Sequence, residues 1–156
     1  MLMIPRIYID TSVIGGYFDP EFEEFTKPFS QRVLDDELRL IYSSITEEEL
    51  SNAPEHVKQF MRDLPENSIE YVEVSDESTE LAMAYLNEGV VGKSSFADCM
   101  HISLASIHRA DLLVRWNFKH IVNVNRIRGY NAVNYKLGYP VIDIRSPREV
   151  GKYEED

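Results

Sequence analysis

Strand-like and helix-like segments alternate along most of the chain, and this alternation is the strongest constraint on its fold. The strand-like runs are short and rich in β-branched and aromatic residues, whereas the segments between them have apolar residues at helical spacing. Parallel strands joined by helices form an open α/β sheet with helices on both faces. The expected strands are Arg6–Asp10, Leu38–Tyr42, Ile69–Val74, Leu112–Arg115 and Val141–Ile144. The expected helices are a short one near Thr11, then Pro28–Leu38, Thr46–Ser51, Glu55–Leu64, Asp76–Glu88, Ser95–Ala110 and Val124–Leu137.

The length and composition indicate one domain. With 156 residues, 44% of them hydrophobic, the chain can bury a core without staples. We expect a single domain over residues 1–145, followed by a short charged tail over residues 146–156. The one cysteine, Cys99, cannot form an intramolecular disulfide, which favours a reducing compartment. No apolar run approaches the roughly 20 residues of a membrane helix, and the first residues lack a signal-peptide layout, so we expect a cytoplasmic protein without a membrane partner.

The charge is unevenly distributed along the chain. A net charge of -11 argues against a nucleic-acid partner, because phosphates attract basic proteins. However, residues 1–88 contain 6 basic and 20 acidic residues, whereas residues 89–145 contain 8 basic and 3 acidic ones. This polarity is compatible with a basic binding surface in the second half, and equally with a solvated acidic surface in the first.

Three acidic residues fall where the carboxyl ends of the expected strands meet, which is where open α/β sheets place their sites. Asp10 closes the first strand, and Glu49 lies in the first helical turn after the second strand. Asp98 lies in the first turn of the long apolar helix. Each acid alone is also explained as part of a helix cap. Together they would repel one another unless a cation neutralised them, and oxygen ligands of this kind suit Mg²⁺ or Mn²⁺.

A fourth candidate element, LLVRWNFKHI, contains the last strand before the polar C-terminal helix. Asn117 follows this strand and offers a carbonyl oxygen to a metal-bound water or an amide to a phosphate. Trp116 and Phe118 fit either the core or a surface on which bases stack.

The segments IYIDTS, ITEEELS, FADCMHISLA and DLLVRWNFKHI resemble, in order and spacing, the four signature regions of the PIN-domain superfamily. This superfamily includes the VapC-like toxins of bacteria and archaea, and the resemblance extends from Arg6 to Arg145. It implies a Rossmann-like three-layer α/β fold with a mostly parallel sheet of strand order 3-2-1-4-5. It also implies metal-dependent ribonuclease activity and a homodimer.

The resemblance assigns the three family acids to Asp10, Glu49 and Asp98, as ligands of Mg²⁺ or Mn²⁺. A register shift of one residue would replace Glu49 by Glu48. The fourth family position is usually aspartate, and this chain has Asn117 there. That departure removes one negative charge, which bears on a second metal ion and on activity itself.

The same resemblance implies that the hydroxyl group of Thr11 or Ser12 contacts the phosphate or a metal-bound water. The substrate is then RNA, which we expect to be single-stranded. The basic residues expected to hold its backbone are Lys119, Arg126 and Arg128, with Lys93 and Arg115 as weaker candidates. A toxin of this family would also have an antitoxin partner that blocks the site.

Other readings of the sequence remain open. The strongest is a PIN-like module with weakened or absent catalysis, which binds nucleic acid or regulates; Asn117 and the net acidity favour it. A haloacid-dehalogenase-type phosphatase needs a second aspartate two residues after Asp10, where this chain has Ser12. A response-regulator receiver needs an acidic pair after the first strand, and this chain has none there. A dinucleotide-binding domain needs a G-x-G-x-x-G motif after the first strand, which this chain also lacks.

Overall fold

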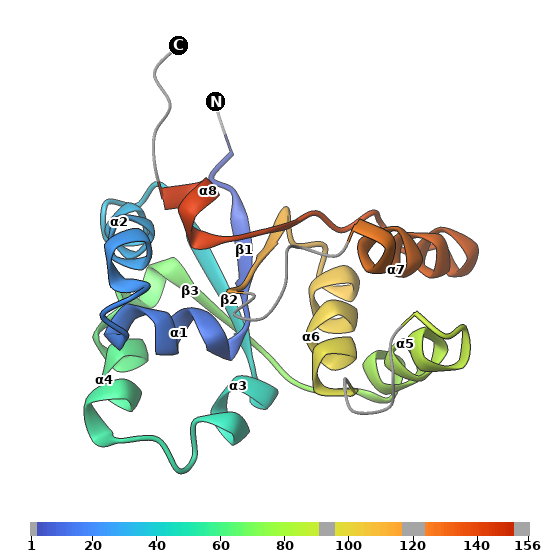
Figure 1. Ribbon diagram of the computed structural model, residues 1–156, viewed down its shortest axis with the longest axis horizontal. Coiled ribbons are helices and arrows are strands. Elements are labelled where there is room, and N and C mark those ends of the chain that lie inside the picture. The colour runs from blue at the N-terminus through green and yellow to red at the C-terminus, as the bar shows by residue number, and fades with distance from the viewer. Residues whose placement is uncertain (1–2, 91–95, 117–123, 152–156) are drawn as a thin grey trace.

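The computed structural model describes residues 3–90, 96–116 and 124–151, and it contains a five-stranded sheet between two groups of helices (Figure 1). The strand order is β3-β2-β1-β4-β5, and all neighbouring strands are parallel. This confirms the α/β fold class and the order 3-2-1-4-5. The strands are β1 (Arg6–Ile9), β2 (Arg39–Ser43), β3 (Ile69–Val72), β4 (Leu112–Val114) and β5 (Ile144–Arg145).

Helices cover both faces of the sheet (Figure 1). One group consists of α1 (Thr11–Phe18), α2 (Glu23–Leu34), α4 (Glu55–Asp63) and α8 (Pro147–Gly151). The other consists of α5 (Asp76–Asn87), α6 (Phe96–Ile107) and α7 (Val124–Leu137), while α3 (Ser44–Glu49) directly follows β2. A 3-10 turn, Glu66–Ser68, precedes β3. Within the described ranges, no helix has the length and apolar character needed to cross a membrane.

From Ile7 to Ile9 the central strand β1 is buried on both faces, which explains the apolar run that follows Arg6. Ile7, Tyr8 and Ile9 are all 0% exposed. Because alternate residues of a strand point to opposite faces, Ile7 and Ile9 pack with α1 and α2, whereas Tyr8 packs with α5 and α6. The carboxyl end of β1 therefore lies at the middle of the sheet edge, between the two groups of helices.

The helix α2 begins earlier than its sequence pattern predicts. The sequence predicts a start at Pro28, but the helix begins at Glu23 and contains Pro28 in its interior. A proline inside a helix removes one backbone hydrogen bond, which usually ends the helix. Here Phe29 and Val33 are buried in the core on the same helix, and Glu24 adds a favourable charge in the first turn. Tertiary packing thus outweighs the local cost of the proline.

The helix α3 begins at Ser44, two residues before the predicted start at Thr46. Thr46 is therefore buried within the helix and does not cap it. The prediction that Glu49 lies in a first helical turn is wrong, because Glu49 is the last residue of α3. The helix is short enough that Glu49 still lies near the sheet edge.

Residues 147–151, expected from the sequence to belong to a charged tail, form α8. This helix packs against α2, and its residue Val150 is 8% exposed. The Nη1 atom of Arg32 on α2 donates a hydrogen bond to the carbonyl oxygen of Val150, at 2.6 Å. The last described turn of the chain is thereby tied to the first helical layer.

Candidate functional site

The three predicted acids all lie at the carboxyl edge of the sheet. Asp10 directly follows β1 and caps α1, where its Oδ1 atom accepts a hydrogen bond of 2.9 Å from the backbone N–H of Ser12. Glu49 ends α3, the helix that directly follows β2. Asp98 lies in the first turn of α6. Three separate elements therefore deliver carboxylates to one edge, as the expected topology requires.

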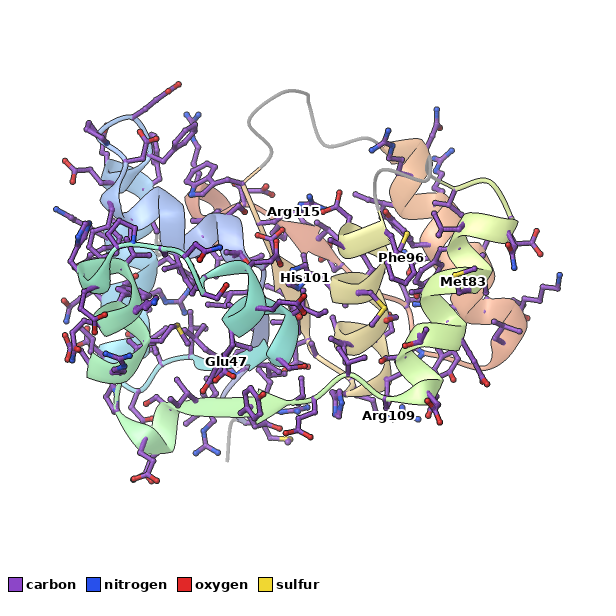
Figure 2. All side chains as sticks on the ribbon, turned by 90° about the horizontal axis from the view of Figure 1, so that it is seen from below. Glu47, Met83, Phe96, His101, Arg109 and Arg115 are labelled. Atoms are coloured by element: carbon purple, nitrogen blue, oxygen red, sulfur yellow. The ribbon has the colours of Figure 1, made fainter. Side chains whose placement is uncertain are left out.

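Asp10 and Asp98 meet at the guanidinium group of Arg115, the first residue after β4. The Nε atom of Arg115 lies 3.4 Å from Oδ2 of Asp10, and its Nη2 atom lies 3.1 Å from Oδ1 of Asp98. Figure 2 shows Arg115 near His101, in the middle of the molecule between α3 and α6. The two carboxylates thus face a common space, which the positively charged guanidinium group of Arg115 fills.

Glu49 is tied to the same site by two side chains. Its Oε1 atom accepts a hydrogen bond of 3.0 Å from the hydroxyl group of Thr11, the neighbour of Asp10. The same oxygen lies 2.6 Å from Nε2 of His101, which is one helical turn beyond Asp98 on α6. Glu48 and Glu49 are both exposed, so it is these two contacts that distinguish Glu49. Glu49 is therefore the glutamate that the structure brings to the other acids.

A buried chain of hydrogen bonds lies behind Glu49. The hydroxyl group of Tyr8 lies 2.6 Å from Nδ1 of His101 and 2.8 Å from Oγ of Ser43. Because an ionised carboxylate only accepts, Nε2 of His101 must donate to Glu49. In a neutral imidazole Nδ1 then accepts from Tyr8, and Tyr8 accepts from Ser43. The hydrogen bond from His101 lowers the pKa of Glu49, which keeps that carboxylate ionised.

Asp10 is the buried member of the set, with 5% of its surface exposed. Burial raises the pKa of Asp10, because desolvation disfavours its charged form, while Arg115 and Ser12 oppose this rise. For Arg115 itself, burial lowers the pKa, but the charges of Asp10 and Asp98 outweigh burial and raise it overall. The site therefore holds an unfavourably buried carboxylate next to the cation that compensates it.

Ser12 and Trp116 brace Asp10 from behind. The hydroxyl group of Ser12 donates to Oδ1 of Asp10 and accepts a hydrogen bond of 2.9 Å from the backbone N–H of Trp116. The indole N–H of Trp116 donates to the hydroxyl oxygen of Thr26 on α2, at 2.9 Å. Its ring packs on Phe22, with ring centroids 4.9 Å apart. Trp116 is thus part of the packing between the sheet edge and α2.

The donor set suits a hard divalent cation, since Asp10 and Asp98 already share one positive charge and Glu49 stands beside them. Within the described part of the chain, no three acidic, histidine or cysteine side chains are arranged to hold one ion together. Arg115 takes the place between two of the acids. The carboxylates therefore suit a divalent metal in charge and chemistry, and in the structure Arg115 lies between Asp10 and Asp98.

Several residues expected to contact RNA lie outside the described residues, namely Asn117, Lys119 and Lys93. Arg126 and Arg128 are exposed on the first turns of α7. Arg126 is close enough to α6 to oppose the rise in the pKa of Cys99, which burial brings to about 11. At least the start of α7 therefore lies near the helix that bears Asp98.

The sequence predicts no role for His101 or Tyr8, and it offers Arg115 only as a weaker candidate for contact with the RNA backbone. One signal was present for His101: it lies three residues after Asp98 and thus on the same helix face. For Arg115 the signal was a charged residue directly after a buried strand. Neither signal identifies the partner, because the partners come from elements distant in the sequence.

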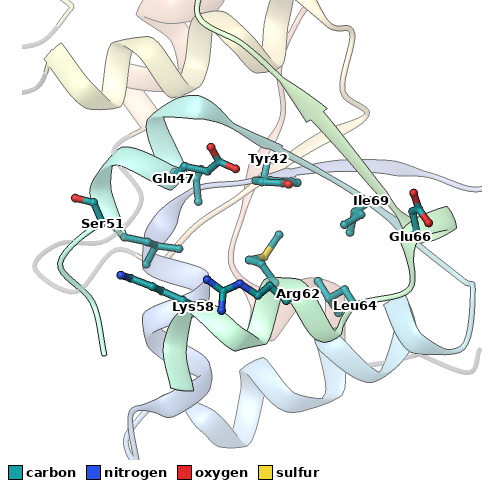
Figure 3. Close-up of a pocket in the computed structure, with 11 residues that line it drawn as sticks. Tyr42, Glu47, Ser51, Lys58, Arg62, Leu64, Glu66 and Ile69 are labelled. Carbon is teal, nitrogen blue, oxygen red and sulfur yellow. The ribbon is translucent and has the colours of Figure 1, made fainter. Parts of the chain in front are cut away.

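A separate hollow of about 670 Å³ lies between α3, α4, β2 and β3. Figure 3 shows Glu47 and Tyr42 on one wall, opposite Lys58 and Arg62. The three acids of the site do not line it. The hollow is therefore distinct from the carboxylate site, with α3 between them.

The chain matches the family described as PIN domain over residues 7–116. This span includes all three acids and Arg115. Among solved structures, the crystal structure of VapBC2 from Rickettsia felis bound to a DNA fragment from their promoter contains a similar chain, with a TM-score of 0.54 and 16% identity. The similarity covers 90% of this chain and 98% of that one, and at this identity it shows the fold. A comparison with curated protein sequences gives no match.

Proposed function

This chain belongs to the PIN domain family, and we propose that it is a metal-dependent endoribonuclease that hydrolyses phosphodiester bonds in single-stranded RNA. One observation carries this proposal. Asp10 and Asp98 contact the same guanidinium group, at 3.4 Å and 3.1 Å, although they come from different elements. Carboxylates that are brought this close together repel one another, so the arrangement favours a bound cation over helix capping alone. PIN domains are typically Mg²⁺-dependent nucleases, and the resemblance assigns these same residues as ligands.

Asp10, Glu49 and Asp98 would hold Mg²⁺ or Mn²⁺. A bound ion of this kind lowers the pKa of a water ligand and offsets the negative charge that develops on the phosphate oxygens. This chain has Asn117 at the fourth family position, where the family usually has an aspartate, so the site has one carboxylate fewer. We therefore propose that one ion is held by the chain alone.

The other site residues position these ligands. The hydroxyl groups of Thr11 and Ser12, which the resemblance directs to phosphate, donate to Glu49 and Asp10 in this structure. They hold the carboxylates in place, and His101 restrains Glu49 through the same Oε1 atom that Thr11 contacts. The proposed contacts to the RNA backbone remain with the basic residues Lys119, Arg126 and Arg128.

The likeness to a chain of VapBC2 supports a toxin within a toxin–antitoxin pair. We include an antitoxin partner, a homodimer and a cytoplasmic location in the proposal. Co-purification of the chain with the product of an adjacent gene, followed by light scattering, tests the first two.

The proposal is tested by cleavage of fluorescent single-stranded RNA in the presence of Mg²⁺ or Mn²⁺. Asp10→Asn is expected to abolish cleavage while the domain stays folded, since asparagine still caps a helix. Asp36→Asn is the matched control: Asp36 is exposed and has a φ of 59°, a conformation that asparagine readily adopts. Unchanged cleavage of the RNA by Asp10→Asn would refute the proposed mechanism.

A second candidate is a PIN domain without catalysis that binds nucleic acid or regulates. Asn117 in place of the fourth acid and the net charge of -11 favour it, because both weaken the case for a catalytic metal site that binds RNA. Retention of RNA by the wild-type protein without cleavage, at saturating Mn²⁺, is the outcome that identifies this function.

A further inference from the structure

We propose that Arg115 is an internal counter-ion of the carboxylate site, which a divalent metal must displace in order to bind. This inference rests on the proposed function, because it concerns the same three acids. It adds a residue that sets metal affinity, and hence the metal concentration at which the site is filled.

The geometry places Arg115 between two of the ligands. Its Cα directly follows β4, the strand beside β1, so its side chain starts at the same sheet edge as Asp10. The guanidinium group reaches Asp10 with Nε and Asp98 with Nη2, at 3.4 Å and 3.1 Å. The side chain is 26% exposed, so these contacts are not those of a surface pair. A cation bound to both carboxylates would need the same space.

Charge balance makes the two cations alternatives. Asp10 is buried, and a buried carboxylate without a positive partner destabilises the fold. Arg115 supplies that partner while no metal is bound. An ion that enters the site with Arg115 still in place would meet like-charge repulsion from the guanidinium group. The apparent metal affinity is therefore reduced by the fraction of molecules in which Arg115 occupies the site.

Arg115 is held in a way that permits its release. Each carboxylate receives a single contact from it, in place of the bidentate pairing that makes arginine–carboxylate contacts strong. Its Nε atom is buried and makes no hydrogen bond among the described residues, since its approach to Asp10 is poorly aligned. The guanidinium group therefore compensates the negative charge of the site, but it does not form a full set of well-aligned hydrogen bonds with the carboxylates.

The test measures Mn²⁺ affinity by the loss of the free-ion signal in electron paramagnetic resonance. Arg115→Gln is expected to bind Mn²⁺ roughly tenfold or more tightly than the wild type, and Arg115→Lys to fall between them. Arg145→Gln is the matched control, because Arg145 is a neighbouring arginine whose partners, Asp143 and Glu149, are exposed. It removes one positive charge and leaves the acids of the site untouched.

Two further measurements separate displacement from general electrostatics. Millimolar methylguanidinium is expected to weaken Mn²⁺ binding to Arg115→Gln, by refilling the vacated place, whereas tetramethylammonium at equal ionic strength is not. Without metal, Arg115→Gln is expected to melt at a lower temperature than the wild type, and Mn²⁺ to raise its melting temperature more. If the glutamine variant does not fold without metal, Arg115→Lys carries the comparison.

Equal or weaker Mn²⁺ binding by Arg115→Gln overturns the inference, as does the absence of binding in both proteins. RNA cleavage by the same preparations is judged separately. Cleavage by the wild type without tighter binding in the variant leaves the proposed function intact and refutes the role of Arg115. Tighter binding without cleavage in either protein keeps the role of Arg115 and refutes the nuclease.

Discussion

The Nε2 atom of His101 lies 2.6 Å from the Oε1 atom of Glu49, so a buried imidazole restrains a carboxylate at the edge of the site. The His101 side chain is 5% exposed and that of Glu49 is 39% exposed. The imidazole is itself fixed by the hydroxyl group of Tyr8. Glu49 therefore reaches the site from a short helix end, but its orientation is set by α6 and β1.

Replacing His101 by alanine is expected to weaken Mn²⁺ binding by about 10–100-fold, because partners of ligating carboxylates influence metal affinity on that scale. The measurement is a Mn²⁺ titration by calorimetry. Ser103→Ala is the control, since Ser103 is a buried residue of the same helix whose hydroxyl group donates to the carbonyl oxygen of Met100. Equal Mn²⁺ affinity in His101→Ala and wild type would show that Glu49 is not a ligand or needs no restraint.

Replacing Glu49 by glutamine is expected to change how stability depends on pH. The pKa of Glu49 is lowered in the fold, chiefly by the hydrogen bond from His101. A lowered pKa stabilises the fold above the unfolded value, about 4.3 for glutamate, and this contribution is lost as the pH falls through the folded pKa. At pH 7 the variant should be less stable by about 1 kcal/mol, with allowance for solvent screening of the half-exposed group. Urea titrations from pH 7 into the acid range should show that the difference in unfolding free energy between wild type and Glu49→Gln disappears. A difference that stays constant with pH contradicts the prediction.

Replacing Asp10 by asparagine is expected to stabilise the metal-free fold at neutral pH. Burial raises the pKa of Asp10, so the folded state binds its proton more tightly than the unfolded state does. Such a group favours the fold below its unfolded pKa, and this advantage disappears as the pH rises through the folded pKa. Asparagine keeps an oxygen for the cap of α1 and lacks the charge.

Thermal melts should therefore place Asp10→Asn at or above the wild type at pH 7, with the difference shrinking in acid. Asp10→Ala also loses the cap and should fall below Asp10→Asn by about 1 kcal/mol. A lower melting temperature for Asp10→Asn at pH 7 would mean that the ion pair with Arg115 outweighs desolvation.

The topology and the helix Val124–Leu137 could be predicted from the sequence because they follow from local patterns and from the family resemblance. Strand ends could be placed to within a few residues, which was enough to bring Asp10, Glu49 and Asp98 to one edge. The start of α2 could not, because the packing of buried side chains overrides the helix-breaking tendency of Pro28. Local propensity competes there with contacts that a sequence pattern does not contain.

The side-chain partners within the site could not be predicted from the sequence, for a related reason. His101 and Glu49 are 52 residues apart, and Ser12 and the backbone of Trp116 are 104 residues apart. Each such contact depends on the rotamers of two side chains on separate elements. A sequence without a structure identifies the acids by their place at strand ends, but it does not show that Arg115 lies between two of them.

The two adjacent glycines of α1, Gly15 and Gly16, have opposite surroundings. A Cβ atom at Gly16 would lie 2.5 Å from the Cδ1 and Nε1 atoms of Trp116, whereas a Cβ atom at Gly15 would have no neighbour within 4 Å. Gly16→Ala must therefore displace the indole ring, and it is expected to lower the free energy of unfolding by about 1–3 kcal/mol. Gly15→Ala is the matched control and is expected to raise it by about 0.5–1 kcal/mol, because alanine favours a helix.

Urea unfolding followed by tryptophan fluorescence measures both effects, since Trp116 is the single tryptophan of the chain. The displaced ring also pulls on the backbone N–H that donates to Ser12, which braces Asp10. Gly16→Ala should therefore also weaken Mn²⁺ binding, and Gly15→Ala should leave it unchanged. Equal stability of the two alanine variants would show that Trp116 moves freely, and its proposed role in bracing the site would then be wrong.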